Sequence, residues 1–229
     1  MAKLTSSEKL DLARTRTNEL VDKVIELIET DAVNDGFIFT DRVSKTIPKS
    51  HAANAYNVLV RNQLDYQIVR TIALWDNCQS NDFEKISIPA ILNLLDADTI
   101  ELAKKQNLAV EIAKEEDGFY REMADESNDR CDEVIGLARR ISASDKLKSL
   151  TNFRSKHLAH NLNQTRLEKK ASEPLQDVSP EELRELLESA IKCISALHIC
   201  LNGTHFDFES AKGFATKNAR ELWDRFKFT

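Results

Sequence analysis

The scarcity of glycine and proline constrains what this chain can fold into more than any other feature. Its 229 residues include five glycines and four prolines. Few turn-forming residues allow few turns, whereas a sheet of several strands needs such residues every few positions. Hydrophobic residues make up 41% of the chain and charged residues 31%, which is typical of a globular protein and not of a disordered one. The sequence therefore predicts an all-α protein with long helices.

Hydrophobic residues recur every three to four positions along most of the chain, as on the buried face of a helix. A clear example lies between Ser6 and Thr30, where Leu10, Ala13, Leu20, Val24 and Leu27 share one side. The predicted helices cover residues 6–30, 48–77, 87–95, 98–116, 119–141, 145–162, 180–202 and 208–226. Residues 31–47, which contain Gly36, and residues 163–178 are expected to be connections.

Helix start and stop signals support these boundaries. Ser179, Pro180 and Glu182 combine a capping serine, a proline at the first helical position and a glutamate at the third. Ser144 is expected to cap the start of the helix over residues 145–162, and the pair Asp98 and Glu101 resembles another capping box. The helix after Ser179 has apolar residues at alternating spacings of four and three until Gly203, a seam more typical of packing within one chain than of a dimer contact. We therefore predict an up-down helical bundle.

Charge is unevenly distributed along the chain. The formal net charge is −6, which argues against a uniformly basic nucleic-acid binder. Residues 145–170, however, contain seven basic and two acidic residues, a local net charge of +5. This segment is either a solvated helix face with a loop or a site for an anionic ligand.

Cysteine usage and hydropathy bear on the compartment. The four cysteines form no C-x-x-C pair, so free thiols in a reducing compartment are expected. The sequence has neither a signal-peptide pattern nor an apolar run of 18 residues. We therefore expect a cytoplasmic protein with no membrane partner.

Arg154, His157 and His160 lie within seven residues inside an apolar helical frame. Arginine binds phosphate oxygens with a permanent charge, and histidine exchanges protons near neutral pH. Together they could cleave RNA without a metal, by activating the 2′-hydroxyl, protonating the leaving oxygen and stabilising the phosphorane. In a continuous α-helix, Arg154 nearly shares a face with His157 but points about 120° away from His160. Convergence of Arg154 and His160 therefore needs a break in the helix or a two-fold dimer.

The Arg154-x5-His160 spacing resembles the Arg-x(4–6)-His signature of the HEPN superfamily of helical ribonucleases. Its wider context, from Phe153 to His160, is similar to the abortive-infection U-type (AbiU-like) branch. The stretches 70–76 and 87–95 also resemble that branch. The resemblance covers about residues 50–165 and does not extend to the last two helices.

This resemblance implies a HEPN-like four-helix core over residues 48–165, within a single helical domain of residues 1–229. Residues 1–47 would form an N-terminal helix and connection, and residues 179–229 two C-terminal helices packed on the core. It further implies a homodimeric, metal-independent endoribonuclease with no cofactor, in a toxin or phage-defence role. Its partners would be RNA and an antitoxin protein.

In this assignment Arg154 binds the phosphate and His160 transfers the proton. Lys156, His157 and Asn161 are expected to contact the substrate. An alternative is a non-catalytic, dimeric HEPN-like module that binds RNA, a nucleotide or a protein. In that case Arg154 would serve only as an anion clamp, and His160 could simply cap a helix end.

Overall fold

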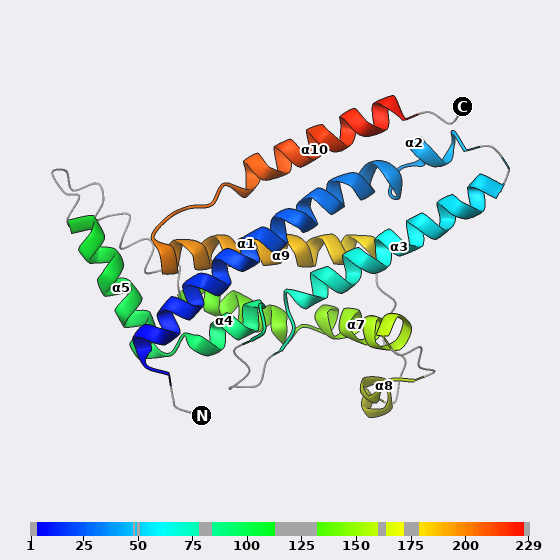
Figure 1. Ribbon diagram of the computed structural model, residues 1–229. Helices are drawn as coiled ribbons and strands as arrows, with labels where there is room; N and C mark the ends of the chain where they lie inside the picture. Colours follow the sequence, from blue (N-terminus) through cyan, green and yellow to red (C-terminus); the bar gives the residue numbers. More distant parts are fainter. Residues whose placement is uncertain are drawn as a thin grey trace. The chain divides into compact units, whose positions relative to one another are not determined.

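The computed structural model describes residues 4–47, 49, 51–77, 84–112, 132–159, 164–171 and 179–226. All regular secondary structure in these ranges is helical, which confirms the predicted all-α class (Figure 1). The elements are α1 (Ser6–Phe37), α2 (Asp41–Ser44), α3 (His51–Ala73), α4 (Ile88–Leu94), α5 (Ala97–Ile112), α7 (Asp145–Phe153), the π-helix η1 (Arg154–Ala159), α8 (Arg166–Ala171), α9 (Pro180–Asn202) and α10 (Phe208–Arg225). Residues 132–142 are also helical.

The chain forms two compact units, each assembled from segments that are distant in sequence. Unit 1 comprises Met1–Asp22, Ala73–Lys148 and Arg184–Phe206. Unit 2 comprises Lys23–Ile72, Ser149–Leu183 and Asp207–Thr229. Because α1 and α9 each cross a unit boundary, both helices contribute residues to both units.

Unit 1 has an aliphatic core to which α1, α4, α5 and α9 contribute fully buried residues such as Leu10, Ile91 and Ile194. Side chains also bind the C-terminal carbonyls of α9, which have no partner within a helix. Arg14 Nε donates to Leu201 O at 2.7 Å, and Asn107 Nδ2 donates to Cys200 O at 2.8 Å. The end of α9 is thereby joined to α1 and α5.

Unit 2 joins α1 to α3 through buried amides and to α10 through aromatic rings. Asn34 Nδ2 donates to Gln67 Oε1 at 2.8 Å, and both residues are fully buried. The ring of Trp223 stacks on that of Phe37, with centroids 5.2 Å apart. Trp223 Nε1 also donates to Val33 O at 3.0 Å. The indole therefore packs directly against the last turns of α1.

This packing explains why the expected connection at residues 31–47 is wrong in its first part. Helix α1 continues to Phe37 and includes Gly36, which we had treated as a turn residue. A Cβ at Gly36 would lie 2.2 Å from Trp223 Cδ1, so the glycine is required by the close approach of the indole and not by a turn. Because Trp223 is far from Gly36 in sequence, the residues around Gly36 give no indication that the helix continues through it.

Several start and stop signals are confirmed and one is wrong. Ser144 Oγ accepts from Leu147 N at 3.2 Å, and Gly203 ends α9 with a φ of 65°. The start of α5 differs from the prediction, because Asp96, and not Asp98, accepts from the backbone N–H of Thr99, at 2.9 Å. Pro48, the first residue of the helix predicted over residues 48–77, lies outside the described residues.

The cysteines depart in part from expectation. Cys193 is a free, fully buried thiol, and burial raises its pKa to about 12. Cys200 is disulfide-bonded, so the expectation of free thiols is wrong for this residue. As for the membrane, the described part of the chain contains no helix with the length and apolar character needed to span a bilayer.

Candidate functional site

The backbone changes from an α-helix to a π-helix at the residue where the predicted site begins. Helix α7 ends at Phe153, and Arg154–Ala159 forms η1. A π-helix has i→i+5 hydrogen bonds, is rare, and occurs frequently at functional sites. The prediction of one continuous α-helix over residues 145–162 is therefore wrong for residues 154–159. The helix type thus changes at Arg154, whereas the break between Arg154 and His160 that would allow them to converge stays a prediction.

The first four residues of η1 differ in exposure. Arg154, Ser155 and Lys156 are partly buried, whereas His157 is exposed. Because the π-helix widens the turn, the α-helical angle that placed Arg154 and His157 on nearly one face does not apply here. His160 and Asn161 lie outside the described residues.

Lys156 is held by a buried carboxylate that sequence reasoning did not single out. Its Nζ lies 2.9 Å from Glu168 Oε1, and the Glu168 side chain is only 4% exposed against 23% for Lys156. Buried charges in proteins need such partners, because the loss of hydration is otherwise costly. The predicted contact of Lys156 with substrate stays a prediction, and part of its charge is already balanced within the chain.

Glu168 also accepts hydrogen bonds from two neutral donors. Thr165 N donates to Oε2 at 2.9 Å, and Asn152 Nδ2 donates to Oε1 at 3.2 Å. The Thr165 hydroxyl in turn donates to Asn152 Oδ1. Bonding to the Thr165 backbone N–H, followed by bonding to the Lys156 ammonium, lowers the pKa of Glu168 to about 2. Glu168 is therefore an anion at neutral pH. We call Asn152, Lys156, Thr165 and Glu168 the buried polar cluster.

The buried polar cluster joins the two sides of the segment that contains His160. Asn152 and Lys156 precede His160 in sequence, and Thr165 and Glu168 follow it. The cluster thus fixes the end of α7 and the start of η1 to the first turn of α8. These hydrogen bonds therefore connect residues that precede and residues that follow the predicted proton-transfer residue in sequence.

Helix α8 lies in what we had expected to be a loop over residues 163–178. The signal that could have found it is the pair Thr165 and Glu168, a capping box like that of Ser179 and Glu182. Thr165 Oγ1 accepts from Glu168 N at 3.2 Å, which completes the reciprocal pattern. Reading this box from the sequence would have predicted a helix start at residue 166 and a role for Glu168.

His157 packs against an aromatic neighbour. Its ring centroid lies 4.9 Å from that of Phe153, with the two planes inclined at 46°. Its predicted contact with substrate also stays a prediction. In the ranges that the structure describes, no three His, Cys, Asp or Glu side chains are grouped so as to hold a metal ion.

A comparison with protein families decides the family. The sequence model of the AbiU2 HEPN family matches residues 9–222. The chain belongs to the AbiU2 HEPN family. The match confirms the resemblance drawn from Arg154, His160 and their context. It also corrects the extent that we gave it, because the AbiU2 match includes the first helix and reaches into α10, well beyond residues 50–165. Comparisons with curated proteins and with solved structures found no match.

Proposed function

We propose that this AbiU2-family protein is a metal-independent endoribonuclease with a toxin or phage-defence role. The observation that carries the proposal is that Arg154 lies at the change in helix type, in a chain that belongs to a HEPN family. Arg154 begins the π-helix, six residues before His160 in the Arg-x5-His motif. The buried polar cluster supports the proposal, because it restrains the residues that flank the motif.

Each residue has a chemical role in this proposal. The Arg154 guanidinium binds the scissile phosphate and stabilises the negative charge that develops on the phosphorane. The His160 imidazole transfers the proton between the ribose 2′-hydroxyl, the leaving 5′-oxygen and solvent. The products would be a 2′,3′-cyclic phosphate and a free 5′-hydroxyl, because the 2′-oxygen is the nucleophile.

A second copy of the chain is the expected partner within the site. Helix α3 exposes Val58, Leu59, Tyr66 and Val69, with 58, 54, 45 and 37% of each residue accessible. These positions fall on one side of the helix, in a stripe about 100° wide. Exposed apolar patches on soluble proteins often mark interaction surfaces. The stripe therefore supports a homodimer, in which two copies of Arg154 and His160 could share one cleft.

The test is cleavage of single-stranded RNA by the full chain in the presence of EDTA. We expect cleavage by the wild type and a loss of at least about 100-fold in rate for Arg154→Ala and His160→Ala, since charge stabilisation and proton transfer each contribute that much. Arg220→Ala and His205→Ala are matched controls, because both residues are exposed and lie outside the motif and outside the basic segment of residues 145–170. A substrate with 2′-deoxyribose at the scissile position should remain intact.

Two results would contradict the proposal. One is a wild type that cuts no RNA over a range of sequences. The other is binding without turnover that depends on Arg154 and not on His160, which would identify the non-catalytic module instead. Mixing the Arg154→Ala and His160→Ala proteins tests the shared cleft: if the two residues act across a dimer, mixed dimers regain one intact site, whereas sites within one protomer stay inactive.

A further inference from the structure

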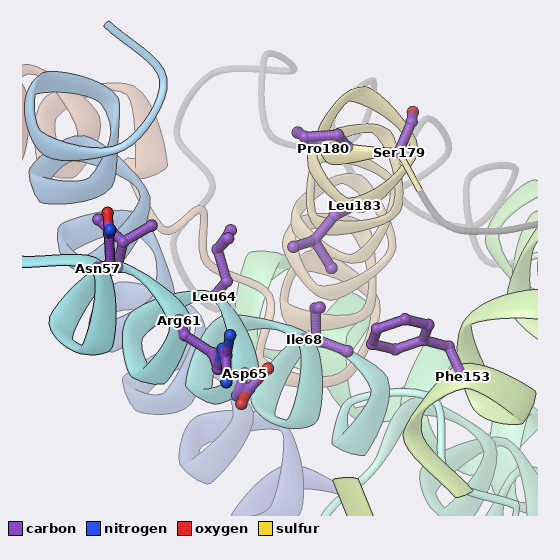
Figure 2. Close-up of a pocket in the computed structure, with 10 residues that line it drawn as sticks. Asn57, Arg61, Leu64, Asp65, Ile68, Phe153, Ser179, Pro180 and Leu183 are labelled. Atoms are coloured by element: carbon purple, nitrogen blue, oxygen red, sulfur yellow. The ribbon is translucent and has the colours of Figure 1, made fainter. Parts of the chain in front are cut away.

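A pocket in unit 2 is lined in part by Phe153, the residue that precedes the predicted phosphate-binding residue Arg154. It has a volume of about 370 Å³ and is formed by α3, by Phe153 at the end of α7 and by the first turn of α9 (Figure 2). Leu64, Ile68 and Leu183 line its apolar part, and Ile68 and Leu183 are only 8 and 2% exposed. A pocket of this size is in the range of small-molecule sites.

Three polar residues of the lining come from one side of α3, and Ser179, just before α9, is a fourth. Asn57, Arg61 and Asp65 are spaced four residues apart, so they follow one another along the helix. Figure 2 shows that Asn57, Arg61 and Asp65 all come from α3. Within the described part of the chain, the side chains of Asn57, Arg61 and Asp65 form no hydrogen bond or ion pair with any other residue. An amide, a guanidinium and a carboxylate are thus available to a ligand.

Phe153 connects this pocket to the motif. Its ring lines the pocket, and the next residue along the chain is Arg154, so the two Cα atoms are about 3.8 Å apart. In a nucleotide, the base and its phosphate are separated by one ribose. An RNA phosphate bound by Arg154 would therefore have a neighbouring base within reach of the pocket.

We propose that this pocket is a base-recognition subsite that takes a guanine of the RNA substrate; the proposal rests on the proposed function. Bases of single-stranded RNA are recognised by aromatic stacking and by hydrogen bonds to their edges. Phe153 provides the ring, with Leu64 and Leu183 as apolar neighbours. Asp65 accepts from guanine N1–H and N2–H, and Arg61 donates to O6 and N7, an arginine contact common in guanine recognition. Adenine lacks both the paired donors and O6.

The first test is binding, which does not depend on cleavage. Short uridine oligoribonucleotides containing one guanine or one adenine, together with guanosine and adenosine monophosphate, are titrated calorimetrically into the full chain. We expect tighter binding of the guanine oligonucleotide and of guanosine monophosphate. Asp65→Asn should weaken both by about tenfold or more, since a paired base contact is worth roughly 5- to 150-fold in affinity, and should leave the adenine ligands unchanged.

Two further variants keep the test decisive. Asp11→Asn, on the exposed side of α1 in unit 1, is the matched control and should bind as the wild type does. Phe153→Leu keeps an apolar side chain but removes the ring, so it should weaken guanine and adenine ligands alike, by roughly 5- to 150-fold for a lost stacking contact. Circular dichroism establishes that each variant is folded.

The outcomes separate this proposal from the proposed function. Equal affinity for guanine and adenine, or no effect of Asp65→Asn in a folded protein, overturns the subsite even if RNA is cleaved. Binding of guanosine monophosphate without preference among the oligonucleotides assigns the pocket to a free nucleotide and also overturns it. Selective guanine binding by a chain that never cleaves RNA supports the subsite and contradicts the nuclease.

Discussion

Two capping boxes, at the starts of α8 and α9, follow the same sequence pattern but differ in what surrounds them. At α9, the side chains of Ser179 and Glu182 bond to each other's backbone N–H, at 3.2 and 3.0 Å, and to no other group in the described part of the chain; a regular helix of 23 residues follows. At α8, Thr165 and Glu168 make the same reciprocal bonds, and their side chains also hold Asn152 and Lys156. Both boxes begin a helix, and the box of α8 also joins two parts of the chain beside the motif.

The comparison teaches that a capping-box pattern in the sequence predicts where a helix starts. It does not predict which distant residues the capping side chains will contact. The difference lies in burial. Glu168 is 3% exposed, whereas Glu182 is partly exposed. A buried carboxylate needs more partners than its cap supplies, and here they come from α7 and η1.

The largest expected effect concerns the regular helix. Ile194 is fully buried in the α9 seam, so Ile194→Ala should lower the free energy of unfolding by about 2–5 kcal/mol through lost burial and the cavity left behind. Urea denaturation measures this. RNA cleavage at temperatures where the variant is folded should stay near the wild-type rate, because the seam lies outside the motif.

Lys192→Ala, at an exposed position of the same helix, is the control and should hardly change the unfolding midpoint. A small effect of Ile194→Ala would mean that α9 contributes little to the core. The contrast between α9, as a helix that stabilises the core, and the capping box of α8, which joins residues beside the motif, would then no longer hold.

Much of the fold could be predicted from the sequence, because its signals are local. The α9 seam predicted burial correctly for Leu183, Leu187, Ala190, Ile194, Leu197 and Leu201, all at 4% exposure or less. The helix expected over residues 208–226 is α10, Phe208–Arg225. In both segments the spacing of apolar residues and the capping residues predict the same helix.

The features that were missed depend on contacts between residues far apart in sequence. The length of α1 is tied to Trp223, which packs over Gly36. The π-helix occurs where apolar periodicity continues through Leu158, so the pattern gave no warning of it. For the site, the sequence provided Arg154 and its motif, whereas the partner of Lys156 became evident only from the arrangement of α7, η1 and α8.

The next effect concerns the charge at the centre of the buried polar cluster. Glu168→Gln preserves the shape of the side chain but leaves Lys156 without its anion, so stability at pH 7 should fall. The pKa of Glu168 is depressed from the ordinary value of 4.5 to about 2, so its contribution is fully present above pH 4.5. It is lost as the pH falls towards 2, where the wild type also becomes protonated.

The measurement is the difference in unfolding free energy between wild type and Glu168→Gln as a function of pH. Asp96 also has a pKa lowered to about 2, chiefly by a hydrogen bond from Lys9. Its contribution to the pH dependence of stability is the same in both proteins and cancels in the difference. A difference that is constant from pH 7 to pH 2 would show that the carboxylate contributes no charge-dependent stability. Glu182→Gln at the other box is the matched control for the loss of a cap.

The smallest expected effect compares the two capping hydroxyls directly. Ser179→Ala removes a cap and should lower stability by about 1 kcal/mol. Thr165→Ala removes a cap and also leaves the buried Asn152 Oδ1 without its donor, which adds about 1–3 kcal/mol. Thermal unfolding of both variants gives the comparison, and the excess should fall to near zero when Thr165→Ala is made in an Asn152→Ala background, because the orphaned oxygen is then absent. Equal losses in the wild-type background would mean that the two boxes are equivalent, and that Thr165 has no role in the buried polar cluster beyond starting α8.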